Sequence, residues 1–144
     1  MPKSSGAARL PETVPTPEDL TGGDFGPPLD LVHLARHCLG DRDLERELLG
    51  LFGRQARNLT AQLSDPSPLS LESKAKIAHK LRGSALAVGA RRVAGAARRI
   101  EELAAAAGDR PRSDMNDRGA EARAVLALLI AVTEAVAEIE RICG

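Results

Sequence analysis

One histidine in this 144-residue chain stands out, within residues 77–90, IAHKLRGSALAVGA. On a helix with about 100° per residue, Ile77 and Leu81 fall on one apolar side, and His79 lies roughly 160° from the middle of that side. His79 is therefore expected to point to solvent. Gly83 follows it by one turn on the same face, although glycine inside a helix costs about 1 kcal/mol relative to alanine. An imidazole beside bare backbone is accessible to another protein.

The residue types around His79 favour nucleophilic catalysis. General acid–base chemistry needs a cleft and an orienting group, but the nearby sequence has no carboxylate beside His79, since Glu72 is two turns away. Ser84 falls on the buried side of the helix, which argues against a hydrolytic nucleophile. No GxxxxGK[ST] motif is present to bind nucleotide phosphates. A neutral imidazole can accept a phosphoryl group on a ring nitrogen, with Arg82 and Lys76 stabilising its charge.

The composition predicts an all-α fold. Apolar residues make up 43% of the chain and are mainly alanine and leucine, and only Phe25 and Phe52 are aromatic. Alanine and leucine favour helices, and β-branched or aromatic runs are missing. A formal net charge of zero argues against a nucleic-acid partner. No apolar run approaches the ~18 residues of a membrane span, and the N-terminus lacks a signal core. We expect a cytoplasmic protein with no membrane contact.

Capping residues and periodicity position the elements. Asp30, Asp41 and Ser70 are the expected N-caps, and Gly89 and Gly108 are the expected breaks. The predicted helices are about 30–38, 42–63, 71–88, 91–107 and 115–142. They form an antiparallel up-down-up-down four-helix bundle with a short extra N-terminal helix. Residues 1–27, rich in Pro, Gly, Ser and Thr, are expected to be a disordered tail, and residues 28–144 to form the bundle.

Each long helix has a predicted core stripe. On the second helix it comprises Leu44, Leu48, Leu51 or Phe52, Gln55, Leu59 and Leu63. On the third it comprises Ile77, Leu81, Ser84, Ala85 and Val88. On the fourth it comprises Val93, Ala96, Ala97, Ile100, Leu103, Ala104 and Ala107. On the last it comprises Val125, Leu128, Leu129, Val132, Ala135, Val136 and Ile139.

The last helix has a second apolar stripe on its other side. It contains Leu126, Ile130 and Ala137. A second stripe needs a second neighbour, which the first helix or the N-terminal tail could supply. A contact between two copies of the chain is the alternative. We expect a monomer.

Cysteine and the remaining histidines give weaker signals. Cys38 and Cys143 have no metal-binding spacing, so we interpret them as two small core residues in a reducing compartment rather than a disulfide. His33 and His37 are four residues apart, a spacing that permits shared metal ligation. No nearby residue clearly completes such a site. We therefore predict two histidines on a polar face and no metal site.

The pattern around His79 resembles the histidine-containing phosphotransfer (Hpt) domain. The segment 78–85, AHKLRGSA, is followed by Gly89-Ala90 and then by Ile100-Glu101. The family has A-H-x-L-K-G-S-A, a following G-A and a later apolar-Glu pair. The resemblance covers roughly residues 30–144. Arg82 stands where the family usually has lysine, which keeps the charge but binds phosphate in a fork rather than as a point charge.

This resemblance implies a phosphocarrier. His79 would accept a phosphoryl group from a receiver-domain aspartate and pass it to another in a multistep phosphorelay. The implied partners are response-regulator receiver domains and a hybrid histidine kinase, and the receiver would bring Mg²⁺. The chain itself would need no cofactor, bind no nucleotide and have no autokinase activity. Ala75, Gly83 and Leu86 would form the docking surface. The alternative is an adaptor bundle that regulates a receiver or kinase without accepting phosphate.

Overall fold

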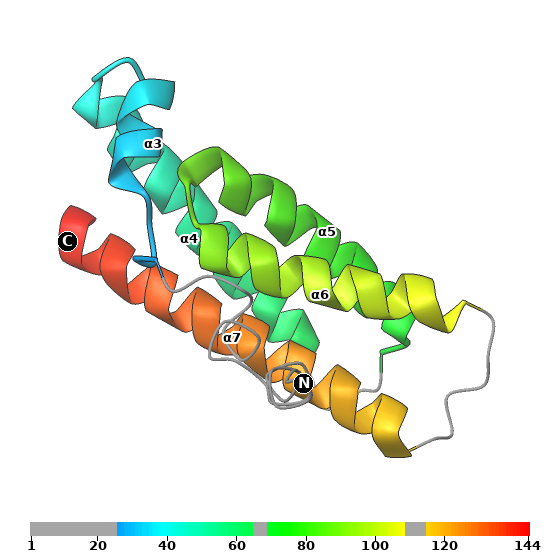
Figure 1. Ribbon diagram of the computed structural model, residues 1–144. Helices are drawn as coiled ribbons and strands as arrows, with labels where there is room; N and C mark the ends of the chain where they lie inside the picture. Colours follow the sequence, from blue (N-terminus) through cyan, green and yellow to red (C-terminus); the bar gives the residue numbers. More distant parts are fainter. Residues whose placement is uncertain (1–25, 65–68, 109–114) are drawn as a thin grey trace, which may run out of the picture.

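The computed structural model describes residues 26–64, 69–108 and 115–144, which form five α-helices and no strand. The helices are α3 (Leu31–His37), α4 (Arg42–Ser64), α5 (Leu71–Val88), α6 (Arg91–Ala107) and α7 (Met115–Cys143). Figure 1 shows four long helices side by side, with α3 at one end. The predicted all-α bundle with a short leading helix is confirmed, and every helix boundary agrees within one residue. The predicted disorder of residues 1–27 falls almost wholly outside the described residues.

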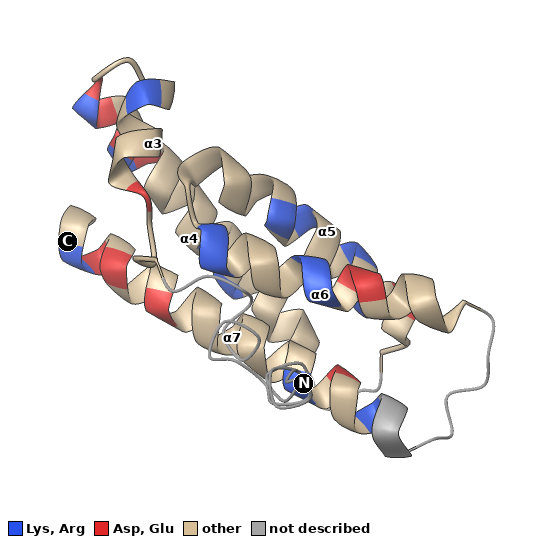
Figure 2. Cartoon of the chain, viewed as in Figure 1, with Lys and Arg blue, Asp and Glu red and all other residues tan. Residues whose placement is uncertain are grey.

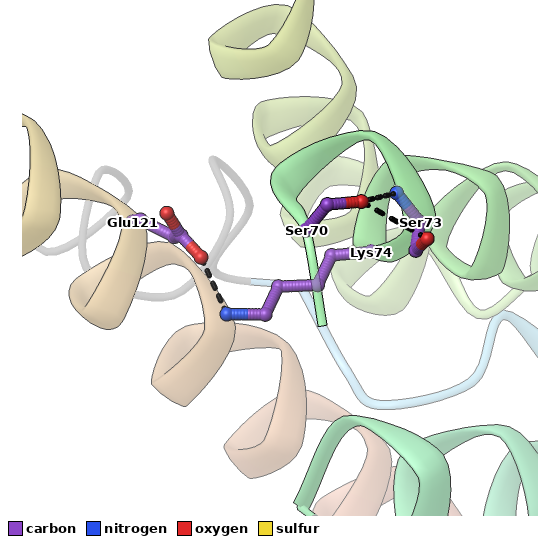
Figure 3. Close-up of polar contacts among 4 residues, drawn as sticks. All are labelled: Ser70, Ser73, Lys74 and Glu121. Carbon is purple, nitrogen blue, oxygen red and sulfur yellow. Dashed lines mark hydrogen bonds and ion pairs between the residues drawn. The ribbon is translucent and has the colours of Figure 1, made fainter. Parts of the chain in front are cut away.

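Side-chain caps define where the first three helices begin. A carboxylate oxygen of Asp30 accepts a hydrogen bond from the backbone N–H of His33 at 3.0 Å. Asp41 accepts one from Leu44 at 3.1 Å. Each of these contacts satisfies a backbone donor that has no partner within the helix. Ser70 caps α5 in the same way through the N–H of Ser73 at 3.0 Å (Figure 3). All three predicted N-caps are confirmed.

The corner between α5 and α6 requires glycine. Gly89 has a left-handed φ of 79° and ends α5. A Cβ there would lie 2.7 Å from the carbonyl oxygen of Asp30. The backbone N–H of Asp30 also donates to the Gly89 carbonyl at 2.9 Å, and the Asp30 carboxylate pairs with Arg91 at 2.9 Å. The start of α3 is thereby fixed to this corner, and only glycine fits both the backbone angle and the close approach.

The core contains a leucine or isoleucine from each helix. Leu34, Leu49, Leu81, Ile100 and Leu128 are all among the fully buried side chains. Small residues fill the contact between α5 and α6, the most extensive of any helix pair. The fully buried alanines there are Ala78, Ala85, Ala90, Ala96 and Ala97. These small side chains allow the two helices to approach closely.

The predicted core stripe of α4 is partly wrong. Phe52, Leu59 and Leu63 of that stripe are buried, Phe52 being the buried member of the Leu51 or Phe52 alternative. Leu44 and Gln55 are exposed, whereas Leu49 and Ala56, which were not predicted, are buried. Leucines occur on two sides of this helix, so periodicity alone does not select the inner one. The inner side is the one with small residues, because these allow the bundle to close on it. On α7 the predicted stripe is confirmed except for two half-buried positions, Val125 and Leu129.

Ion pairs join α7 to the other long helices. Lys74 in the first turn of α5 reaches across to Glu121, as Figure 3 shows. Arg92 of α6 lies 2.8 Å from Glu134. Arg57 of α4 pairs with Glu140 near the C-terminus. These pairs link α7 to its neighbours in addition to the apolar packing. None of the helices in the described part of the chain is long and apolar enough to cross a bilayer.

The two cysteines have different environments. Cys38 is buried at the end of α3, and burial raises the pKa of its thiol. Cys143 is exposed at the end of α7, so the prediction of a core position is wrong for this residue. Both thiols are free. The exposed position follows from the bundle ending there, with no further helix among the described residues to cover the last turn.

Candidate functional site

His79 lies in the middle of α5 on its outer face. Its side chain is 69% exposed, whereas the adjacent Ala78 and the nearby Leu81 are fully buried. The cap at Ser70 and the glycine corner at Gly89 fix both ends of this helix. The prediction that His79 points to solvent is confirmed. Its imidazole is held on a rigid element while remaining accessible.

A carboxylate from the next helix contacts this imidazole. The Nδ1 atom of His79 lies 2.9 Å from Oε1 of Glu101, whose side chain is only 22% exposed. A carboxylate can only accept hydrogen bonds, so Nδ1 carries the proton and donates it. The lone pair of a neutral imidazole then lies on Nε2. This contact presents Nε2 as the nucleophilic atom.

The sequence-based conclusion that no carboxylate lies beside His79 is therefore wrong. Helical spacing identifies neighbours along one helix, but Glu101 is 22 positions away and comes from α6. The available signal was the Ile100-Glu101 pair of the family pattern. Ile100 is fully buried. Its burial fixes the rotation of α6, so that Glu101 emerges at the border with α5.

Arg82 compensates the charge of the second carboxylate oxygen. Its Nε atom lies 2.9 Å from Oε2 of Glu101, and this buried oxygen accepts no hydrogen bond from the described residues. The contact is thus an ion pair rather than an aligned hydrogen bond. Because a guanidinium has five N–H groups, Arg82 keeps donors beyond the one nearest Glu101. Glu101 therefore bridges His79 and Arg82, and its carboxylate is held between two nitrogen groups.

The other predicted site residues lie around His79 and form no hydrogen bond or ion pair with its side chain. Lys76 is exposed one turn before it, and its Nζ lies 3.9 Å from Glu72, a loose surface pair. Ala75 is half-buried, and Leu86 is 51% exposed. A Cβ at Gly83 would meet no atom within 4 Å. Packing among the described residues therefore gives no reason for glycine there, and the open space adjoins the His79 face.

Ser84 has a different role from the one that its helical position predicts. It is half-buried rather than buried. Its hydroxyl donates to the amide oxygen of Gln55 on α4. The hydroxyl lies at the border of two helices, where a polar partner is available, which is why burial is incomplete. Ser84 therefore joins α4 to α5, and its hydroxyl bonds to Gln55 rather than to His79.

The other two histidines of the chain lie together on α3. The rings of His33 and His37 stack with centroids 5.8 Å apart. The described residues contain no group of three or more His, Cys, Asp or Glu side chains that could hold a metal ion. The pair has no third ligand in the described part of the chain.

Comparison with known proteins identifies the family. The family model of the Hpt domain matches residues 42–142, from the first residue of α4 to the last turn of α7. No curated protein and no solved structure matched the chain. Hpt domains act in histidine phosphotransfer in phosphorelays, where they interact with receiver domains. Because the match covers more than half of the sequence and contains the exposed histidine with its carboxylate partner, the chain belongs to the Hpt domain family.

Proposed function

We propose that this chain is a phosphocarrier that accepts a phosphoryl group on Nε2 of His79 from a receiver-domain aspartate and passes it to another receiver. The observation that carries this proposal is the contact between Nδ1 of His79 and Glu101, on an imidazole that is 69% exposed. It combines a defined nucleophilic atom with access for a partner protein. Membership of the Hpt family supports it.

The transfer is a displacement at phosphorus. The lone pair on Nε2 attacks, the N–P bond forms, and the P–O bond to the aspartate breaks. Its electron pair leaves with the aspartate carboxylate. The imidazole ring gains positive charge as the N–P bond forms. Glu101 stabilises that charge through the Nδ1–H bond, because its own negative charge is already in place and needs no reorganisation. Transfer to the next receiver is the reverse reaction.

Two cations on α5 offset the charge of the phosphoryl group. Arg82 is held near His79 by Glu101 and keeps donors for phosphoryl oxygens. Lys76 is exposed and only loosely paired, so its ammonium can move toward the group once it is transferred. The receiver supplies Mg²⁺ and the aspartyl phosphate. A hybrid histidine kinase would phosphorylate that receiver, and this chain would have no autokinase activity.

The surface around His79 is suited to a docking protein. Gly83 leaves open space beside the imidazole, and Leu86 exposes an apolar side chain two turns after it. Ala75 adds a small residue one turn before it. We propose these three residues as the contact surface for the receiver. An exposed leucine and a side-chain-free patch together allow the close approach that in-line transfer needs.

The direct test uses a receiver domain charged with labelled phosphate in the presence of Mg²⁺. The wild-type chain should take up label that is acid-labile and alkali-stable, as phosphohistidine is. His79→Gln should take up none. His33→Gln is the matched control, because His33 is another exposed histidine on a helix, and it should be labelled like the wild type.

Two outcomes contradict the proposal. Normal labelling of His79→Gln would exclude His79 as the acceptor. Absence of label on the wild type, combined with binding of the receiver in the same samples, would favour the alternative adaptor function, in which the bundle regulates a receiver or kinase without accepting phosphate.

A further inference from the structure

The outer face of α7 lacks the charges that a solvent-facing helix normally has. Leu126 is 57% exposed and Ile130 is 45% exposed. The residues that share this face recur every three or four positions and are uncharged: Gly119, Ala122, Leu126, Ile130, Thr133 and Ala137. We call them the α7 stripe. The hydroxyl of Thr133 donates to the carbonyl of Leu129 at 2.8 Å, so its polar group already has a partner within the helix. The α7 stripe is thus apolar over about five helical turns.

Other outer faces of the bundle differ. On α6 the exposed positions include Arg91, Arg98 and Glu102, and α4 exposes Arg54 and Arg57. Figure 2 shows α7 free of charged residues through its middle, with charges toward its two ends. A stripe of this length on one side of a surface helix is typical of helix pairing rather than of exposure to water.

Charges at the edges of the α7 stripe are basic toward its N-terminal end and mainly acidic toward its C-terminal end, where Arg141 is an exception and pairs with Glu138 within the chain. Arg118 and Arg123 lie toward the N-terminal end. Glu134 and Glu140 lie toward the C-terminal end. Arg123 and Glu134 are eleven residues apart, which is three helical turns, so they lie along the same edge. Arg118 and Glu140 are 22 residues apart, about six turns, and share the opposite edge.

This arrangement is self-complementary in one orientation. When two α7 helices pack face to face and antiparallel about a two-fold axis, each edge of one stripe meets the same edge of the other stripe. The N-terminal end of one helix then meets the C-terminal end of the other. An axis near Leu128 places Leu126 beside Ile130 of the other copy. The same register brings Arg123 opposite Glu134. On the other edge it brings Arg118 close to Glu140. A parallel pairing would instead place the basic ends together and the acidic ends together.

We propose that the α7 stripe is the contact between two copies of this chain, with their α7 helices antiparallel. Glu134 and Glu140 already pair with Arg92 and Arg57 within the chain, and an intermolecular arginine adds a second cation to each. Because one helix pair forms a small interface, the dissociation constant should be micromolar rather than nanomolar.

The dimer leaves both phosphoryl-transfer sites free. His79 is on α5, and α5 and α7 each pack mainly on α4 and α6, so they lie across the bundle from each other. The two copies of His79 therefore face away from the shared contact. The inference does not depend on the function of His79, and it replaces our expectation of a monomer.

Sedimentation velocity of the full chain, from low micromolar to several hundred micromolar, tests this proposal. The wild type should shift from monomer to dimer over this range. Leu126→Glu and Ile130→Glu should each raise the dissociation constant about tenfold or more, because they place like charges at the symmetric contact. Val32→Glu is the control, an exposed apolar residue on α3, and should dimerise normally. Circular dichroism confirms that each variant is folded.

The charge swap tests the orientation. Arg118→Glu and Glu140→Arg should each weaken the dimer, and the double variant should restore it, since the opposite charges again meet in the antiparallel pair. A wild type that stays monomeric at the highest concentration would overturn the proposal. The proposal would also be overturned if the full chain stays monomeric and dimerises only once residues 1–25 are removed, because the N-terminal segment would then occupy the α7 stripe.

Discussion

Two regions of the molecule present exposed histidines, and they differ in what supports them. His79 is in the middle of an eighteen-residue helix with both ends capped, and Glu101 of another helix contacts its ring at 2.9 Å. His33 and His37 lie on a seven-residue helix, and their ring contact is with each other. All three imidazoles are exposed. Residue type and exposure are thus shared, while the tautomer is fixed only at His79.

This difference supports the proposed role of His79 as the nucleophile. An imidazole in water exchanges its proton between two nitrogens, and its orientation varies. At His79 a partly buried carboxylate selects one nitrogen as the donor, and Arg82 holds that carboxylate. The open space at Gly83 adds access. We therefore attribute the reactivity proposed for His79 to neighbours on two helices.

Removing Glu101 should make His79 behave like the histidines of α3. We expect Glu101→Ala to lower the rate of phosphoryl transfer about 10²-fold, because the imidazole loses its orientation and the charge that stabilises its developing cation. Rapid-quench transfer from a phosphorylated receiver gives the rate, and ¹⁵N NMR of the ring reports the tautomer. Glu102→Gln is the matched control, since Glu102 is the adjacent exposed carboxylate and pairs with Arg98. A wild-type rate in Glu101→Ala would contradict this role.

A side chain in the open space beside His79 should stabilise the fold but slow phosphoryl transfer. Gly83→Gln should raise the free energy of unfolding by about 0.5–1 kcal/mol, because glutamine favours a helix and the added side chain meets no neighbour. The same change should slow transfer about tenfold or more, because the side chain obstructs the receiver. Thermal unfolding and rapid-quench transfer measure the two effects. Ala61→Gln, on the exposed side of α4, should change neither by much. Unchanged transfer in Gly83→Gln would refute the access argument.

Much of the fold could be predicted from the sequence because its signals are local. Asp30, Asp41 and Ser70 cap their helices through side-chain contacts three residues away. Gly89 ends α5 through its own backbone angle. Such features depend on neighbours along the chain, and the sequence displays those neighbours directly. The exposed position of His79 was predictable for the same reason, from periodicity within one helix.

Features that depend on contact between helices were not predictable in this way. The contact of Glu101 with His79 depends on how α6 is rotated, which the burial of Ile100 decides. The contact of Ser84 with Gln55 depends on the spacing of α4 and α5. The inner face of α4 was predicted only in part: Leu44 and Gln55 were wrongly included, because leucines occupy two sides of this helix and only packing chooses between them.

The contacts of Asp30 hold the start of α3 to the corner between α5 and α6, and we call them the α3 anchor. They give the prediction with the smallest expected effect, a change in stability with pH that should affect α3 and not α5. The pKa of the Asp30 carboxyl is lowered, mainly by the hydrogen bond from the backbone N–H of His33; desolvation opposes this in part, and the Arg91 guanidinium adds a smaller lowering effect. A carboxyl whose pKa is lowered on folding stabilises the folded state above its unfolded pKa. That contribution is lost as the pH falls through the lower, folded pKa. The α3 anchor should therefore be constant near neutral pH and weaken in acid. The cap of α5 uses the hydroxyl of Ser70, which does not titrate in this range.

Asp30→Asn tests this dependence, since asparagine still caps a helix but cannot pair with Arg91. At neutral pH the variant should be slightly less stable than the wild type. The difference should begin to shrink as the pH falls below about 4, the ordinary pKa of an aspartate, and should vanish below the lower, folded pKa. Urea unfolding at several pH values measures that difference, and amide hydrogen exchange in α3 and α5 locates it. Glu102→Gln, which alters a carboxylate remote from α3, should leave exchange in α3 unchanged. A stability difference that stays constant down to pH 3 would show that the charge of Asp30 does not hold α3 to the α5–α6 corner. The backbone hydrogen bond between Asp30 and Gly89 would then be enough to hold α3 in place.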